Sequence, residues 1–186
     1  WLLEDLGFHV THLSASDAHD DGAFGPEFDH LVLLVDCPAD GDDIPWLVDA
    51  GWGDTFCEPL RIDLTSEQPQ GLRSYRLDQH EGNYLLWQRD YDGYLERHYR
   101  FTLQPRRYVE FEPMCQFHQT SPQSIFTQRR ICTIATASGR ITVDDARLIV
   151  TESGQRQVHS VATEVEYHAL LRKHFGVVLE QADSPS

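Results

Sequence analysis

The stretch HLVLLVDCPADGDDIPWLVDAGWGD, residues 30–54, decides the fold. Two apolar runs flank a short acidic segment with Asp40-Gly41 at its centre, and Asp-Gly between apolar runs is a strong hairpin signal. If Asp40-Gly41 forms a two-residue turn, the numbers of facing residues sum to 81, so Val32 faces Asp49. The stretch therefore predicts an antiparallel hairpin whose strands are apolar on both faces.

The same register brings a histidine and an aspartate together. Residues 30, 32, 49 and 51 share a face, and His30 and Asp49 become diagonal neighbours about 7 Å apart at Cα. A buried Asp that accepts a hydrogen bond from one imidazole nitrogen fixes the tautomer and raises the basicity of the other nitrogen. The pair is either the base and orienting group of a catalytic triad or a structural hydrogen bond inside a barrel, and the hairpin alone leaves both interpretations open.

Further strand-like segments surround the hairpin. Apolar and polar residues alternate in residues 8–16 and in PLRIDL, SYRLD, NYLLWQRD and YLERHYRFTL. Within the hairpin, WLVDAGW is predicted to form one strand. This pattern predicts a mostly antiparallel sheet that curls into a barrel over residues 8–104. Before it, WLLEDLG reads as the tail of a longer helix that ends at Gly7.

The sequence pattern changes after residue 104, where the long series of alternating strand segments ends. Residues 105–125 form an interdomain segment with a short helix in RRYVEFEPMCQFHQ and a turn at TSPQS. A smaller α/β domain over residues 126–186 contains three strands, RRICTIAT, GRITVDDARLIVT and QRQVHSV. Thr163 and Glu166 form a capping box for a last helix that ends at Gly176. The fold class predicted from the whole pattern is mixed α+β.

Composition narrows the function classes. The 186 residues carry 15 basic and 30 acidic side chains, a net charge of −15, and Lys173 is the only lysine. A surface this acidic disfavours DNA, RNA and anionic lipid. No apolar run approaches the roughly 20 residues of a membrane span. The four cysteines form no CxxC motif, and reduced thiols in a cytoplasm are expected.

None of these cysteines is a convincing partner for His30. Cys37 lies seven residues along the strand from His30, about 23 Å at strand rise, and beside acidic residues that disfavour a thiolate. Cys57, Cys115 and Cys132 lie on other segments, and all four are expected to be small buried hydrophobes. No metal site is expected either: the closely spaced histidines are His9, His12 and His19, and a strand turns the first two to opposite faces.

The ordered segments LGFHV, HLVLLVD, VDAGWG, EPLRI, YRFTLQPRRYVEFEPM, QTSPQSIF, GRITV and a final helix ending HFG resemble the arylamine N-acetyltransferase family over nearly the whole chain. The resemblance implies an N-terminal helical bundle, a β-barrel and an α/β lid. It also implies a nucleophilic cysteine in an RGGxC motif upstream of Trp1, so that residues 1–7 are the tail of the first domain and this fragment is inactive alone. His30 and Asp49 match the catalytic His and Asp of the family.

The resemblance also implies a reaction and further site residues. The reaction is ping-pong acetyl transfer from acetyl-CoA to an arylamine, hydrazine or N-hydroxyarylamine, without a metal. Phe28 and Trp52 are the candidate substrate-binding residues. The candidates for the cofactor site are Gly51, Gly53, Phe117, Thr120, Ser121 and Ser124, while Arg106, Arg107, Arg129 and Arg130 are candidates for a positive field around an anionic cofactor.

Two alternatives share these features. One is a non-catalytic binding or regulatory relative that keeps the fold without the nucleophile. The other is a different acyl transferase or protease that uses a Cys-His-Asp triad but lacks the TSPQSIF and YVEFEPM segments. The acceptor amine and the oligomeric state have no signal in the sequence.

Overall fold

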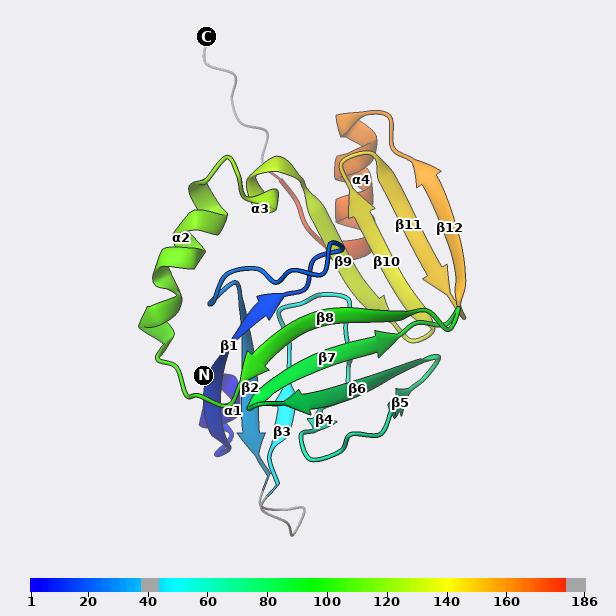
Figure 1. The fold of residues 1–186 in the computed structure, drawn as a ribbon. Coiled ribbons are helices and arrows are strands. Elements are labelled where there is room, and N and C mark those ends of the chain that lie inside the picture. The colour runs from blue at the N-terminus through cyan, green and yellow to red at the C-terminus, as the bar shows by residue number, and fades with distance from the viewer. Residues whose placement is uncertain (38–43, 180–186) are drawn as a thin grey trace. The chain divides into compact units, whose positions relative to one another are not determined.

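The computed structural model describes residues 1–37 and 44–179, and Figure 1 shows their helices and strands. The chain divides into two compact units, Trp1–Phe117 and His118–Ser186, which are described one at a time. The predicted turn at Asp40-Gly41 lies outside the described residues.

The first unit contains an antiparallel sheet whose eight described strands follow the order β4-β3-β2-β1-β8-β7-β6-β5 (Figure 1). The strands are β1 (His9–Asp17), β2 (His30–Asp36), β3 (Trp46–Val48), β4 (Leu60–Arg61), β5 (Gln68–Gln70), β6 (Arg73–His80), β7 (Asn83–Arg89) and β8 (Leu95–Thr102). The sheet curls into a nearly closed barrel, so the predicted fold class of a β-barrel followed by a smaller α/β part is confirmed.

Two glutamine side chains connect the edge strands of this barrel. The Gln68 amide accepts from the Arg61 N–H at 2.9 Å and donates to the Arg61 carbonyl at 3.0 Å. The Gln70 amide accepts from the N–H groups of Cys57 and Glu58 and donates to the Glu58 carbonyl at 2.7 Å. A primary amide has an N–H donor and a C=O acceptor, as a peptide group does. These two side chains therefore form hydrogen bonds with backbone N–H and C=O groups at the edge of the sheet, where there is no neighbouring strand to do so.

The pairing of β2 with β3 has the register that the hairpin predicts. Leu33 faces Val48 and Leu34 faces Leu47, so the numbers of facing residues sum to 81. The prediction that one strand runs on through residue 52 is wrong, because β3 ends at Val48 and the next residues form bends. The strand ends where the next side chain, Asp49, accepts hydrogen bonds from the backbone of its own segment.

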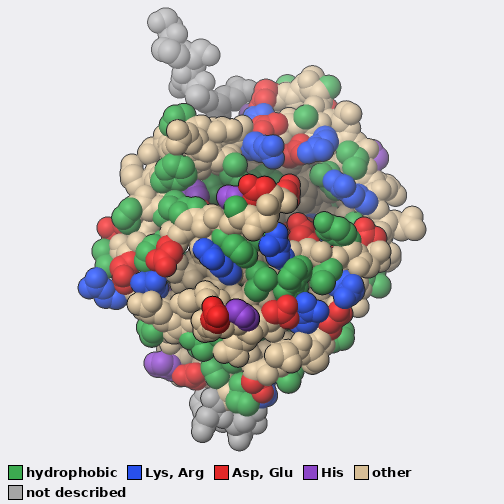
Figure 2. Space-filling view, viewed as in Figure 1, with side chains coloured by type: hydrophobic (Ala, Val, Ile, Leu, Met, Phe, Trp, Pro, Cys, Tyr) green, Lys and Arg blue, Asp and Glu red, His purple; other side chains and the backbone are tan. Residues whose placement is uncertain are grey.

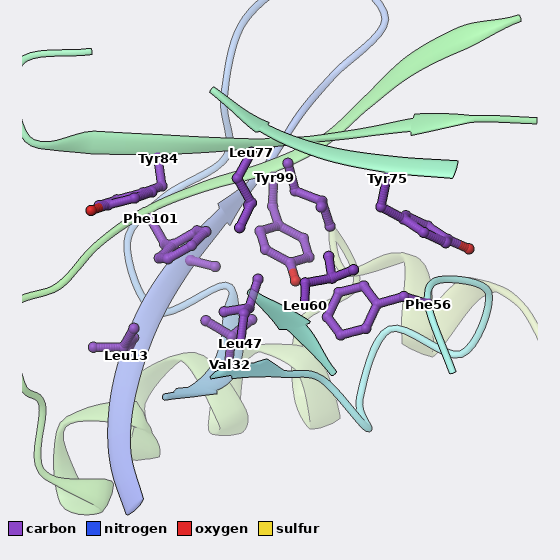
Figure 3. Packing of buried hydrophobic residues seen from close by; sticks show 12 residues of the cluster. Leu13, Val32, Leu47, Phe56, Leu60, Tyr75, Leu77, Tyr84, Tyr99 and Phe101 are labelled. Atoms are coloured by element: carbon purple, nitrogen blue, oxygen red, sulfur yellow. The ribbon is translucent and has the colours of Figure 1, made fainter. Parts of the chain in front are cut away.

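The barrel is filled by inward-facing aliphatic and aromatic side chains (Figure 3). Leu13, Val32, Leu47 and Leu60 are fully buried, as expected for alternate residues of strands with one face inward. The ring of Tyr84 stacks on Phe101 at 5.3 Å. Burying such rings contributes more to stability than any polar contact of the barrel, at about 25 cal/mol per Å² of apolar surface.

Strand β8 contains an irregularity that the period-two pattern does not predict. Leu86 of β7 faces Tyr99, but Trp87 faces Arg97, so His98 is an extra residue in the ladder. As a result His98 and Tyr99 are both buried although they are consecutive. A β-bulge redirects a side chain in this way.

The helices of the first unit follow the sequence pattern. Helix α1 (Leu2–Asp5) ends before Gly7, which has a φ of 91° and donates its N–H to the Glu4 carbonyl. The 3-10 turn η2 (Tyr108–Phe111) leads into helix α2 (Glu112–Thr120), which confirms the short helix predicted for this segment. Phe111 is the buried residue of the turn.

The second unit has four antiparallel strands in the order β12-β11-β10-β9. They are β9 (Ile131–Thr136), β10 (Gly139–Asp144), β11 (Arg147–Glu152) and β12 (Gln155–Ser160). The prediction of a single strand for GRITVDDARLIVT is wrong, because the segment folds into β10 and β11. The Asp144 carboxylate accepts from the Ala146 N–H at 3.0 Å and so stabilises a tight turn between them.

Helix α4 (Glu164–Phe175) packs on this sheet through Tyr167 and Leu171, which form a core with Val143 and Val161. Thr163 caps it by accepting from the Glu166 N–H, and the helix ends at Gly176 with a φ of 69°, as predicted. The Glu166 carboxylate accepts from Ala162 and not from Thr163, so the capping box is displaced by one residue. A short helix α3 (Ile125–Gln128) precedes the sheet.

Candidate active site

His30 and Asp49 are in direct contact. His30 is the first residue of β2, Asp49 follows the last residue of β3, and the imidazole Nε2 lies 2.8 Å from the carboxylate Oδ2. The side chains are 12% and 0% exposed, so the prediction of a largely buried, hydrogen-bonded pair is confirmed. Burial excludes water as a competing partner and gives the hydrogen bond a fixed direction.

The rest of the Asp49 carboxylate is saturated by backbone donors. Its Oδ1 accepts from the Gly51 N–H at 2.9 Å and from the Trp52 N–H at 3.2 Å. Burial raises the pKa of Asp49, but the hydrogen bond and charge of His30 and the two amides outweigh it, so the pKa lies below the usual range. Asp49 is therefore a stable anion with its second oxygen committed to His30.

This contact decides which imidazole nitrogen is available for chemistry. Because the anionic Asp49 can only accept, it selects the tautomer with the proton on Nε2 and leaves the Nδ1 lone pair of His30 as the base. The backbone at Gly51 approaches the same ring closely: a Cβ there would lie 3.0 Å from His30 Cε1. Glycine at this position lets the loop pass the imidazole without displacing it.

Aromatic rings surround the pair. The edge of Trp52 meets His30 at a centroid distance of 5.3 Å and an angle of 82°. Tyr99 lies 5.3 Å from both rings and is fully buried. Burial raises the pKa of Tyr99 well above its usual range, and the nearby Asp49 charge adds to this effect. The sequence analysis missed Tyr99, because the alternation of apolar residues in β8 does not show which ring of the barrel lies against His30.

Phe28 is held in an unusual backbone conformation two residues before His30. Its φ is 68°, which is rare for a bulky side chain. Its N–H donates to the Ser14 hydroxyl at 2.7 Å, and its ring meets the edge of Phe111 at 5.2 Å beneath the Arg106 guanidinium. Contacts from three other segments therefore hold the strained residue in place.

The candidate cofactor residues are divided between the two units, and Gly51, Gly53 and Phe117 belong to the first. Gly51 lies beside His30, and Gly53 has a φ of 83° that allows the tight bend after Trp52. Phe117, on α2, is 37% exposed.

The remaining candidates lie in the second unit. Thr120 is exposed, the Ser121 hydroxyl accepts from the Gln123 N–H, and the buried Ser124 hydroxyl caps α3 by accepting from the Phe126 N–H. Two of the three hydroxyls thus already stabilise the local turn.

Most of the candidate arginines are neutralised by carboxylates. Arg106 contacts Glu27 at 3.3 Å, and Arg107 contacts Glu110 at 3.6 Å. Arg130 bridges Asp145 and Glu164 at 2.7 and 2.8 Å. Figure 2 shows the same intermixing of basic and acidic side chains over the visible face. Three of the four candidate arginines therefore have a carboxylate beside them, which offsets their positive charge.

The described cysteines differ from the prediction in part. Cys57 and Cys115 are exposed, so the expectation that they are buried is wrong; next to Cys57, Phe56 fills the inward position instead. Cys132 packs against the core of the second unit. In residues 1–37 and 44–179, no three His, Cys, Asp or Glu side chains are arranged to hold a metal ion. No helix in these ranges is long and apolar enough to span a bilayer.

Comparison with known proteins identifies the family. A family model described as N-acetyltransferase matches residues 1–184. The chain is 31% identical over 210 residues to arylamine N-acetyltransferase 2 of Mus musculus, covering 97% of this chain and 69% of the relative. The chain therefore belongs to the arylamine N-acetyltransferase family, as the sequence resemblance predicts.

The chain is also similar to other proteins and to solved structures. Proansamycin X synthase of Amycolatopsis mediterranei (strain S699) is 31% identical over 176 residues, covering 92% of this chain and 66% of that protein. Among solved structures, the M. smegmatis arylamine N-acetyltransferase aligns with a TM-score of 0.87 and 28% identity, over 95% of this chain and 64% of that one. The Mycobacterium marinum arylamine N-acetyltransferase in complex with CoA aligns with a TM-score of 0.84 and 26% identity, over 94% of this chain and 65% of that one. The chain spans about two thirds of the length of these relatives.

Proposed function

We propose that this chain is part of an enzyme that transfers the acetyl group of acetyl-CoA to an arylamine, hydrazine or N-hydroxyarylamine. The observation that carries the proposal is the buried hydrogen bond between His30 Nε2 and Asp49 Oδ2. This contact leaves Nδ1 as a base with a fixed direction. A nucleophilic cysteine upstream of Trp1 is the third member of the triad, as the resemblance to the family implies.

The proposed first half-reaction acetylates the cysteine. His30 Nδ1 takes the thiol proton, and the imidazolium that forms is stabilised by Asp49. The thiolate attacks the thioester carbonyl of acetyl-CoA, a new S–acyl bond forms, and the bond to the CoA sulfur breaks. CoA leaves as its thiol after taking the proton from His30 Nδ1, so the imidazole is neutral again. No metal takes part, because side chains supply both the nucleophile and the base.

In the proposed second half-reaction the acceptor takes the acetyl group. Its amine nitrogen attacks the acyl carbon, the cysteine leaves as thiolate, and the amine proton passes to His30 Nδ1. Trp52 and Phe28 flank the pair along the chain and are the proposed acceptor contacts. Gly51, Gly53, Phe117, Thr120, Ser121 and Ser124 remain the proposed cofactor residues, and buried Ser124 would act there through the loop that it caps.

Reading the coding sequence upstream of Trp1 is the direct test. An RGGxC motif supports the enzyme, whereas a Met codon without such a cysteine would favour the non-catalytic relative. The protein with its upstream segment is then assayed for CoA release from acetyl-CoA with a panel of arylamines and hydrazines. His30→Ala is expected to abolish acetyl transfer.

The chain offers a matched control for this variant. His9 also contacts an aspartate, Asp36, at 2.6 Å, but that pair is largely exposed. His9→Ala is therefore expected to keep normal turnover. Near-normal turnover of His30→Ala would contradict the proposal, and hydrolysis of peptides without acetyl transfer would favour the alternative of a different Cys-His-Asp enzyme.

A further inference from the structure

His98 has no assigned role, yet the fold brings it to the back of the site. It is the extra residue of the bulge in β8, and without the bulge the alternation of the strand would turn it away from buried Tyr99. Instead it is 5% exposed. A β-bulge can redirect one side chain, and bulges occur often next to active sites. The position of this bulge directly before Tyr99 therefore suggests that the redirected side chain, His98, has a role at the site.

The redirected ring meets Trp52. The His98 imidazole stacks nearly parallel on the indole, with a centroid distance of 5.2 Å and an angle of 26°. The same indole meets His30 edge-on at 5.3 Å and Tyr99 at 5.3 Å. Trp52 is thus held between the stacked ring of His98 and the edge contact with His30.

Histidine is a costly residue for this position. Burial lowers the pKa of His98 to about 4, so the ring is neutral at physiological pH. Its Nδ1 is buried and has no hydrogen-bond partner among the described residues. A hydrocarbon of similar size would avoid the penalty of this unpaired nitrogen. Ring shape and placement, and not hydrogen bonding, are what His98 contributes in this structure.

We propose that His98 is a positioning residue that fixes the orientation of Trp52 and thereby sets the specificity for the acceptor. The positioning role follows from the described contacts alone, whereas the role in specificity rests on the proposed function, in which Trp52 contacts the acceptor amine. A flat ring behind the indole prevents it from turning, so the acceptor meets a rigid aromatic surface. Without that ring, the indole gains room to rotate away from His30.

The orientation of Trp52 can be measured in this chain without any catalysis. The four tryptophans are labelled with 5-fluorotryptophan, and the Trp52 signal is assigned by its loss in Trp52→Phe. His98→Leu is expected to shift or broaden the Trp52 signal, and His98→Phe, which keeps a flat ring, is expected to leave it sharp.

Tyr84→Leu is the matched control, because it removes another buried stacked ring of the same barrel, the partner of Phe101. It is expected to leave the Trp52 signal unchanged. An unchanged Trp52 signal in folded His98→Leu would overturn the positioning role, and so would an equal change in Tyr84→Leu.

Kinetics of the protein with its upstream segment test specificity. His98→Leu is expected to raise the acceptor KM about tenfold, the order of effect of a reshaped apolar pocket, with the rate of enzyme acetylation by acetyl-CoA unchanged. His98→Phe is expected to restore the acceptor KM. If the wild type acetylates amines and His98→Leu has the wild-type acceptor KM, the specificity role is wrong. If the wild type transfers no acetyl group, the proposed function fails, and the fluorine signal alone decides on His98.

Discussion

Replacing Asp49 by asparagine is expected to reverse the tautomer of His30. The asparagine carbonyl can keep both hydrogen bonds from the Gly51 and Trp52 amides, at 2.9 and 3.2 Å in the wild type. Its NH₂ group then faces His30 Nε2, where the wild type has a carboxylate oxygen at 2.8 Å. Because an NH₂ group only donates, His30 must accept through Nε2 and carry its proton on Nδ1. The base is then lost at the nitrogen that the proposed chemistry uses.

The size of the effect follows from the contacts that change. All three hydrogen bonds to residue 49 can persist, but each changes from a bond to an anion into a neutral bond. Removing the buried charge also removes its desolvation cost, which offsets part of this loss. Hydrogen bonds to charged groups contribute about 1.5–3 kcal/mol and neutral ones about 1 kcal/mol, so Asp49→Asn should lower the free energy of unfolding by about 1–2 kcal/mol. If the proposed function holds, turnover should fall by about 10⁴-fold, the effect of the same change in a serine protease triad.

The pH dependence has a defined sign. The pKa of Asp49 is lower in the folded state than in the unfolded chain. Its stabilising contribution is therefore fully present above the unfolded pKa and is lost as the pH falls through the folded pKa. The stability difference between the wild type and Asp49→Asn should shrink on acidification below about pH 4, the ordinary pKa range of aspartate.

Two measurements check this reasoning. The ¹⁵N shifts of His30 report which ring nitrogen bears the proton, and urea unfolding at several pH values gives the free energy difference. Asp36→Asn, in the exposed pair with His9, is the matched control and should leave stability nearly unchanged. A His30 ring that keeps its proton on Nε2 in Asp49→Asn, or a stability difference that grows on acidification, would refute the argument.

Three further changes test other parts of the structure. Phe28→Gly should be more stable than Phe28→Ala by about 1 kcal/mol in urea unfolding, because glycine tolerates the φ of 68° without strain; equal stability would mean that the strain is absent. Gly51→Ala would place a Cβ 3.0 Å from His30 Cε1, so the His30 ring signals should shift while the overall fold persists. Gly139→Ala would drive a Cβ into the Thr151 carbonyl oxygen, so the unit His118–Ser186 should lose more than about 2 kcal/mol of its free energy of unfolding, as measured by circular dichroism melting.

Much of the local structure follows from neighbouring residues. The alternation of apolar side chains and the parity of the hairpin predict that His30 and Asp49 meet, since the register of two paired strands fixes which residues share a face. The last helix follows from Thr163 and Gly176, because caps act through hydrogen bonds and backbone angles within one turn. Such interactions are local, so a single stretch of sequence contains all of their partners.

Other features arise only when distant segments come together. The bulge at His98 depends on the fit of β8 to β7, and the pairing of Gln68 and Gln70 with the far edge depends on how tightly the sheet curls. The burial of the Asp49 carboxylate requires that His30 and the next turn satisfy it at once. The sequence by itself thus determined most of the strands, the register of the β2–β3 hairpin and the identity of the His–Asp pair. The tertiary structure decided which rings surround that pair, because packing depends on contacts between residues that no local pattern links.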